Sequence, residues 1–265
     1  MKKNILIMSG LLATLSLTAY SALQKNTSNP KPREISRVAS GSNSEILIQG
    51  LAPVADFMLD VDSRFNTTIT KEKLEGATSI LEILPEKATQ SLVGYSQVEL
   101  GILSKDGETI AVGKNEILNT AQIELIENAD YATNFYIKSN CFKKYSYSGF
   151  LEPFNLVYYI SVTPEKEARY IPGHTELMQY LKDNSKAETA IAQEGQLKSG
   201  KISFTVTRAG TIRNISLEST SGYASIDEKM KQLIENIPGE WSPAENEKGQ
   251  KVDQQLVLSF GLLGC

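Results

Sequence analysis

Few residues in this chain of 265 could do chemistry. The sequence holds one His, His174, and two Cys, Cys141 and Cys265. One His cannot build a poly-His metal site, and two Cys cannot build a zinc ribbon or an iron–sulfur cluster. His174 follows Pro-Gly ahead of a predicted helix, and no Ser or Cys nucleophile stands in a recognisable elbow, which favours a surface or N-capping role over catalysis. The sequence therefore predicts no enzyme, no cofactor site and no metal site.

One segment, 195–201, matches most of a phosphate-binding loop through Gly195, Gly200 and Lys201. The next residue is Ile202 rather than Ser or Thr, so the hydroxyl that would bind Mg²⁺ is missing. The segment also leads into a predicted strand, whereas a phosphate site needs the N-terminus of a helix. We interpret it as a Gly-Lys turn before a strand.

Composition narrows the classes of partner. The chain has 27 Lys and Arg against 31 Asp and Glu, a formal net charge of −4, and it has no block of basic residues. This balance argues against nucleic acid and anionic membrane surfaces as partners, and no small-molecule substrate is inferred. Apolar residues make up 41% of the chain, which is enough for a packed core.

The first 22 residues have the pattern of a secretory signal peptide. A cationic head with Lys2 and Lys3 precedes an uncharged, mostly apolar run at 5–17, and small residues follow at cleavage spacing at 19–22. Cleavage predicts a periplasmic protein. The alternative is an uncleaved inner-membrane anchor that faces the periplasm, for which the apolar run is barely long enough. Residues 23–44, rich in Asn, Ser and Lys, predict a flexible tether.

Residues 45–164 are predicted to form a β-rich, sandwich-like and mainly antiparallel domain. Its expected elements are a strand at 46–48, a helix at 70–84 ended by Pro85, a hairpin of strands near 98–102 and 109–112 with a turn at 105–107, and strands at 134–139 and 156–163. Three aromatic residues near a Gly turn, Tyr145, Tyr147 and Phe150, are expected to pack within a hairpin rather than to form a binding face.

Residues 165–265 are predicted to form a small αββαβ module with an antiparallel sheet, which makes the fold class α+β. The expected elements are a helix near 177–181 with a weaker helical stretch at 186–193, strands at 202–206 and 211–218, a helix with a capping box at Ser225 and Glu228, and a final strand at 252–260. Trp241 is expected to fill the core of this module, and the two Cys are expected to stay unbridged within the chain.

This segment resembles the C-terminal domain of TonB-family proteins. The block at 237–244, Ile-Pro-Gly-Glu-Trp-Ser-Pro-Ala, is similar to that family's P-x-x-W-x-P-A pattern, and a turn at Gly249 and a terminal strand follow it in the same order. Residues 204–212 resemble the family's first hairpin, and 171–173 resemble the lead-in of bacteroidete members. The resemblance implies structural roles for Pro238, Trp241, Pro243 and Gly249.

The resemblance also implies a function. Such domains bind outer-membrane transport receptors, or other envelope proteins, in support of transmembrane transport, and a short extended receptor segment pairs with the last strand. An open sheet edge offers unpaired backbone groups for such a segment. The side chains expected to face the partner are Lys251, Asp253, Gln255, Val257 and Ser259, with Val257 as an exposed apolar spot and Val252, Leu256, Leu258 and Phe260 toward the core.

Two alternatives stay open. A membrane-anchored energy transducer would couple the proton gradient to outer-membrane import through inner-membrane motor proteins, and it needs an uncleaved N-terminus. The chain lacks the family's long Pro-rich spacer and the His of its membrane helix, so partner binding carries over more readily than energy transduction. The other alternative is a secretion- or motility-associated structural scaffold, in which the β-rich domain is the working part.

Overall fold

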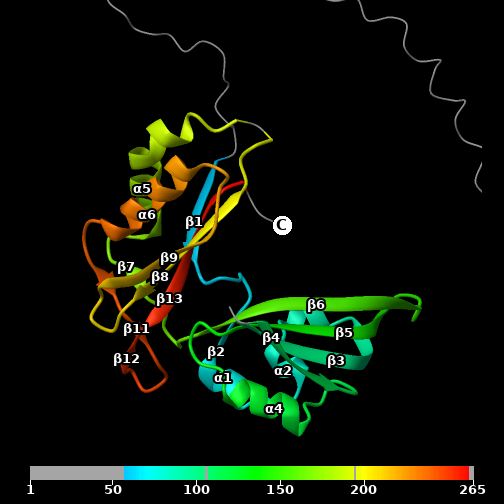
Figure 1. The fold of residues 1–265 in the computed structure, drawn as a ribbon. Helices are drawn as coiled ribbons and strands as arrows, with labels where there is room; N and C mark the ends of the chain where they lie inside the picture. Colours follow the sequence, from blue (N-terminus) through cyan, green and yellow to red (C-terminus); the bar gives the residue numbers. More distant parts are fainter. Residues whose placement is uncertain (1–56, 105–106, 194, 263–265) are drawn as a thin grey trace, which may run out of the picture. The chain divides into compact units, whose positions relative to one another are not determined.

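The computed structural model describes residues 57–104, 107–193 and 195–262, which form two main sheets with their helices (Figure 1). The predicted signal peptide, the tether, the strand at 46–48, most of the turn at 105–107 and Cys265 lie outside the described residues. Within the described ranges, no helix is both long and apolar enough to cross a membrane.

The N-terminal sheet has five strands in the order β2-β6-β5-β3-β4, all antiparallel except β2, which runs parallel to β6. Its strands are β2 (Thr68–Thr70), β3 (Leu92–Ser104), β4 (Gly107–Gly113), β5 (Asn134–Lys144) and β6 (Leu151–Thr163). Four helices belong to the same part of the chain: α1 (Lys71–Glu75), α2 (Ile80–Ile83), α3 (Glu86–Thr89) and α4 (Thr120–Glu127). The β3–β4 hairpin is confirmed.

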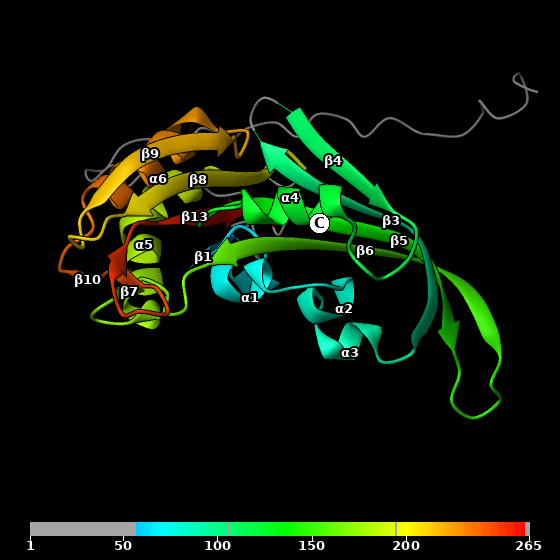
Figure 2. The same cartoon turned by 90° about the horizontal axis from the view of Figure 1, so that it is seen from below.

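Helices rather than a second sheet cover one face of the N-terminal sheet (Figure 2). Buried residues of α1, α2 and α4 form one core with residues of β3, β5 and β6; among them are Leu74, Ile80, Ile126, Leu100, Ile137 and Ile160. The prediction of a sandwich-like domain is therefore wrong. Strand alternation shows that one face is buried, but it does not show what buries it.

The predicted helix at 70–84 is divided into α1 and α2. Gly76 ends α1, and Ser79 opens α2 by accepting from the Leu81 N–H while Glu82 reaches back to the backbone of Ser79. Because a capping box fixes a new helix start, the chain turns here and Leu81 points to solvent. The apolar spacing had predicted one continuous helix.

The C-terminal sheet has the strand order β1-β13-β8-β9, with every neighbour antiparallel. Its strands are β1 (Met58–Asp62), β8 (Ser199–Val206), β9 (Ile212–Ser219) and β13 (Gln254–Gly261). Helices α5 (His174–Thr189) and α6 (Ala224–Glu235) lie side by side along it (Figure 1). The same part of the chain holds two separate two-stranded sheets: β7 (Arg169–Tyr170) with β10 (Trp241–Ser242), and β11 (Ala244–Glu245) with β12 (Lys251–Val252).

The order α5-β8-β9-α6-β13 confirms the predicted succession of helix, strand, strand, helix and strand. Helix α5 continues to Thr189 without the predicted interruption. The apolar face of α6 is buried as expected, but its predicted capping box is wrong, because Tyr223 is the N-cap residue and its side chain accepts no capping hydrogen bond. Buried Asp227 instead accepts from the Ser221 N–H at 2.8 Å and from the Thr220 hydroxyl at 2.5 Å.

Candidate functional site

Strand β13, which the sequence predicts as an open edge, lies inside the C-terminal sheet. β8 pairs with it on one side, and β1 pairs with it on the other, from Met58 opposite Gly261 to Asp62 opposite Val257. The prediction of an open final strand is therefore wrong. The physical reason is the one that motivated the prediction: an unpaired edge attracts a strand, and here β1 of the same chain supplies it.

The five predicted contact residues fall into two groups. Lys251 lies in β12 opposite Glu245, and Asp253 accepts from the Arg208 N–H at 2.8 Å. Gln255, Val257 and Ser259 lie on β13 itself. Val257 is only 4% exposed and stands opposite Asp62 of β1, so the expected exposed apolar spot is wrong. Gln255 and Ser259 are half-buried, and they alternate with the core residues Leu256, Leu258 and Phe260.

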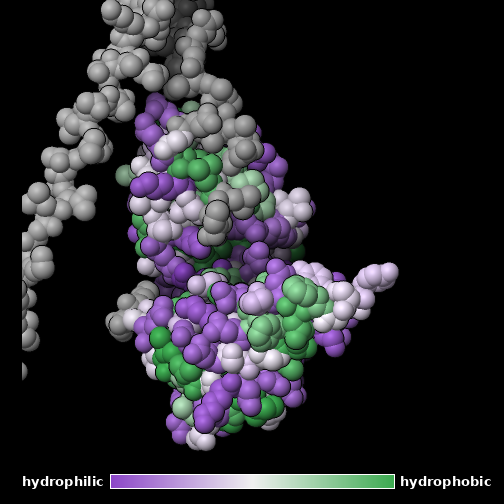
Figure 3. All heavy atoms as spheres, turned by 90° about the vertical axis from the view of Figure 1, so that its right-hand side faces the viewer, coloured by the Kyte–Doolittle hydropathy of each residue, from purple (hydrophilic) through white to green (hydrophobic). Residues whose placement is uncertain are grey.

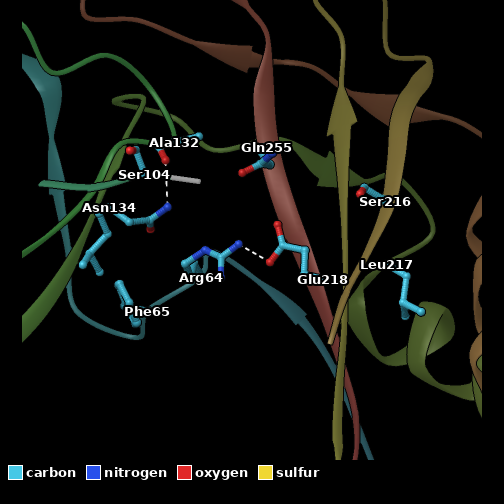
Figure 4. A pocket seen from close by; sticks show the side chains of 10 residues that line it. Arg64, Phe65, Ser104, Ala132, Asn134, Ser216, Leu217, Glu218 and Gln255 are labelled. Carbon is cyan, nitrogen blue, oxygen red and sulfur yellow. Dashed lines mark hydrogen bonds and ion pairs between the residues drawn. The ribbon is translucent and has the colours of Figure 1, made fainter. Parts of the chain in front are cut away.

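Gln255 lines a cavity of about 620 Å³. Figure 4 shows Gln255 beside Arg64 and Glu218, whose side chains form an ion pair. Because the two charges neutralise each other, this cavity offers no net charge to an ionic ligand.

Strand β1 is the part of the site that the sequence did not reveal. Phe57, Leu59 and Val61 stand at alternate positions and pack against the core of the C-terminal sheet. Between them, the Asp60 carboxylate lies 3.3 Å from Nε2 of His174, the first residue of α5. The period-two alternation of these apolar residues was the available signal, although it spans only five positions.

A second cavity, of about 360 Å³, lies where β1 ends. Val61 and Asp62 line it together with residues of other elements, among them Tyr170, His174, Trp241 and Leu256. His174 is well exposed there, which confirms the expected surface position. The cavity thus borders both β1 and β13.

Trp241 fills the core next to this cavity, as predicted. It is 6% exposed, and its ring centroid lies 5.6 Å from that of Tyr170 and 5.9 Å from that of Phe204. Its buried indole N–H has no hydrogen-bond partner among the described residues. A buried donor without a partner is costly.

The other motif residues fix the path of the chain around Trp241. The Tyr170 hydroxyl donates to the Pro238 carbonyl at 2.5 Å, and Pro243 follows β10 directly. Gly249 adopts a φ of 69° in the turn between β11 and β12, a conformation that favours glycine. These contacts connect α6 to the last strands.

Two titratable groups outside this region, Cys141 and Tyr136, have raised pKa values that their surroundings in the fold explain. Burial raises the pKa of the Cys141 thiol, which lies in the N-terminal core with Sγ 3.4 Å from the Phe154 carbonyl oxygen, so its reactive thiolate is disfavoured. Burial and hydrogen bonds to Glu99 and Glu108 raise the pKa of Tyr136. In the parts of the chain that the structure describes, no group of three or more His, Cys, Asp or Glu side chains could hold a metal ion.

Comparisons with known proteins add no relative: no protein-family model matches the sequence, and no match was found among curated proteins or among solved structures. What the site can do is therefore inferred from its own contacts. These are a strand paired on both sides, a bordering cavity and a buried indole donor without a partner among the described residues.

Proposed function

We propose that this chain is a periplasmic protein of the TonB C-terminal family type, whose C-terminal sheet binds an extended segment of an outer-membrane transport receptor or another envelope protein. Binding would occur by β-strand addition and would serve transmembrane transport. The observation that carries the proposal is the pairing of β13 with a strand from outside residues 165–265. The αββαβ order and the packing of the Trp241 block support it.

The side of β13 away from β8 accepts an antiparallel strand in this structure, where β1 occupies it. Its backbone pairs with five residues of an antiparallel strand, at Val257–Gly261. Leu258 and Phe260 on the same stretch are buried and meet the apolar residues of that strand. Main-chain hydrogen bonds would supply affinity, and alternate side chains would supply selectivity.

A photo-cross-linking experiment tests this placement. A small diazirine residue at Ser259, half-buried on β13, should cross-link the full chain to synthetic peptides that carry the periplasmic N-terminal segments of outer-membrane receptors. The same residue at Arg213, exposed on β9, is the matched control and should give no cross-link. Equal labelling from both positions would contradict strand addition at β13.

The periplasmic assignment is tested separately from binding. We expect the mature chain in the periplasmic fraction, with an N-terminus near Leu23 by mass spectrometry. Intact Met1 in the membrane pellet would instead favour the anchored energy transducer, because coupling to a motor in the inner membrane requires an uncleaved N-terminal segment.

One observation favours the scaffold as a second candidate. Aromatic side chains at and near the tip of the β5–β6 hairpin are exposed: Phe142, Tyr145, Tyr147, Phe150 and Phe154. Hairpin packing was expected for Tyr145, Tyr147 and Phe150. The rings of Tyr145 and Phe150 do approach each other, at 6.3 Å, but the expectation is wrong for Tyr147, which is fully exposed. Exposed aromatic clusters are common in protein interfaces.

The β5–β6 hairpin projects past the helices in Figure 2 and extends to the right in Figure 1. Figure 3 shows the molecule from that right-hand side, where green apolar patches lie among purple polar ones. If this surface binds the partner, Tyr147→Ser with Phe150→Ser should abolish capture of a purified envelope partner while the fold is retained. Ser148→Ala at the same tip is the control. Unchanged capture by the double variant would remove the scaffold candidate.

A further inference from the structure

We propose that β1 is a displaceable internal ligand of β13, and that the partner which replaces it is an extended segment of the same chemistry, with apolar residues at alternate positions and an acidic residue between them. The inference rests on the proposed function, because it concerns how the same side of β13 receives its partner. It follows from the position of β1, from its contacts and from what its departure would leave.

Removal of β1 would leave the C-terminal core in place. Among the fully buried members of that core, Val61 alone comes from β1, and the others come from Tyr170 to Phe260. The sheet would keep β13, β8 and β9 with both helices, while the outer side of β13 would lose its pairing at Val257–Gly261. Such an edge is open to another strand.

The hold of β1 on the sheet is short and partly polar. Of its five residues, Met58, Asp60 and Asp62 are exposed, Leu59 is half-buried and Val61 is buried. A segment that presents larger apolar side chains at the positions of Leu59 and Val61 would bury more apolar surface against the same core. Such a segment could therefore compete with β1 for the same side of β13.

A longer segment would also make contacts that β1 does not make. β1 pairs with β13 only as far as Val257, whereas β13 begins at Gln254. An antiparallel segment that continued past the position of Asp62 would next meet Leu256, which lines the 360 Å³ cavity together with Trp241.

The contacts of β1 define the chemistry of the replacement. Leu59 stands opposite Phe260 and Val61 stands opposite Leu258, so these two positions require apolar side chains. Asp60, opposite Ser259, lies 3.3 Å from Nε2 of His174, so an acidic side chain is favoured between them. The partner is thus an apolar–acidic–apolar extended segment rather than a helix or a basic peptide.

The test uses the full chain and a fluorescent peptide with the sequence of residues 57–63. Val61→Lys places a charge toward the core and should release β1, whereas Met58→Lys makes the same change at an exposed position of the same strand. We expect the Val61→Lys chain to bind the peptide at least tenfold more tightly than the wild-type chain, because the internal competitor is removed. Met58→Lys should bind it like the wild type.

A locked variant decides the question independently of how well Val61→Lys folds. Asp60→Cys combined with Ser259→Cys places two thiols at directly opposed positions of β1 and β13. Once mass spectrometry confirms the bridge, the oxidised chain should lose peptide binding, and reduction should restore it. Equal binding by the oxidised and reduced forms would overturn the proposal, as would a folded Val61→Lys chain that binds no better than wild type.

The binding of receptor segments, measured on the same variants, distinguishes the proposed function from the displacement of β1. If the peptide of residues 57–63 binds only the released chain, but no receptor segment binds either form, the proposed function fails and β1 remains a displaceable strand. If receptor segments bind the locked and reduced forms equally, β1 need not leave, and the partner binds elsewhere on the molecule.

Discussion

The two sheets of this protein are completed in different ways. In the N-terminal sheet, β3 with β4 and β5 with β6 are hairpins, so two of its four pairings join strands that are neighbours in the sequence. The C-terminal sheet takes its outer strand, β1, from the opposite end of the described chain and places it next to β13. A hairpin strand is covalently held beside its partner, whereas a distant strand is held mainly by its contacts and can be exchanged more easily.

Both sheets share one packing feature. In each, a glycine lies under an aromatic ring of the directly opposite residue on the adjacent strand: Gly101 under Tyr136, and Gly200 under Phe260. A Cβ at Gly101 would lie 2.3 Å from the Tyr136 ring, and one at Gly200 would lie 2.5 Å from the Phe260 ring.

Loss of a central aromatic residue should destabilise each sheet separately. Trp241→Ala and Phe135→Ala each remove a buried ring from one of two distinct cores, and each should lower the free energy of unfolding by about 3–5 kcal/mol. Hydrogen exchange with mass spectrometry should show increased exchange mainly in the sheet that carries the change. A Trp241→Ala chain that keeps its melting temperature but loses partner binding would make Trp241 a contact residue instead.

Filling the space under either ring should have an intermediate effect. Gly101→Ala and Gly200→Ala should each cost about 1–3 kcal/mol, because the ring must shift within packed surroundings. Gly76→Ala is the control, since its Cβ would meet nothing closer than 3.6 Å. Chemical denaturation measures all three. A neutral Gly200→Ala would show that Phe260 can move without cost, and would weaken the comparison.

Alkaline pH should act on the N-terminal sheet through Tyr95. Burial, followed by the charges of Cys141 and Glu116, raises the pKa of Tyr95 to about 12. In the unfolded chain the hydroxyl ionises near its ordinary pKa of 10.0, so its contribution is intact below pH 10 and is lost as the pH rises through 12. Tyr95→Phe should remove about 2–3 kcal/mol of this loss.

At neutral pH the same change should cost little, because the Tyr95 hydroxyl has no hydrogen-bond partner among the described residues. The measurement is the free energy of unfolding between pH 8 and pH 12, with Tyr147→Phe as the exposed control. If wild type and Tyr95→Phe lose stability in parallel over this range, Tyr95 does not carry the effect.

The smallest effect on stability is expected at the hairpin tip. Tyr147→Ser removes a fully exposed ring and should change the free energy of unfolding by less than about 0.5 kcal/mol. Thermal unfolding measures this. A larger loss would mean that Tyr147 is covered in solution, and it would remove the hairpin from consideration as a free binding surface.

The sequence by itself determined most local structure of the C-terminal half. The alternation of Ile202, Phe204 and Val206 placed β8, and the helical spacing of Ile226, Met230 and Leu233 placed α6, because each pattern reports one buried face. The single Trp between two prolines correctly indicated a core residue. In the N-terminal half the β3–β4 hairpin and strands β5 and β6 were also predicted, although β3, β5 and β6 run further than their apolar cores suggested. Strand β2 and helix α4 were not predicted.

Only the tertiary structure decided what covers each face and each edge. Periodicity showed that Leu100 and Ile137 are buried, but helices α1, α2 and α4 rather than a second sheet bury them. The outer side of β13 was predicted to be open for a partner's segment, but β1 occupies it, and the five residues of β1 carry too short a pattern to reveal a pairing with the far end of the chain. Local sequence encodes the tendency to pair, and long-range packing selects the partner because contacts between distant residues leave no mark on the spacing of either segment.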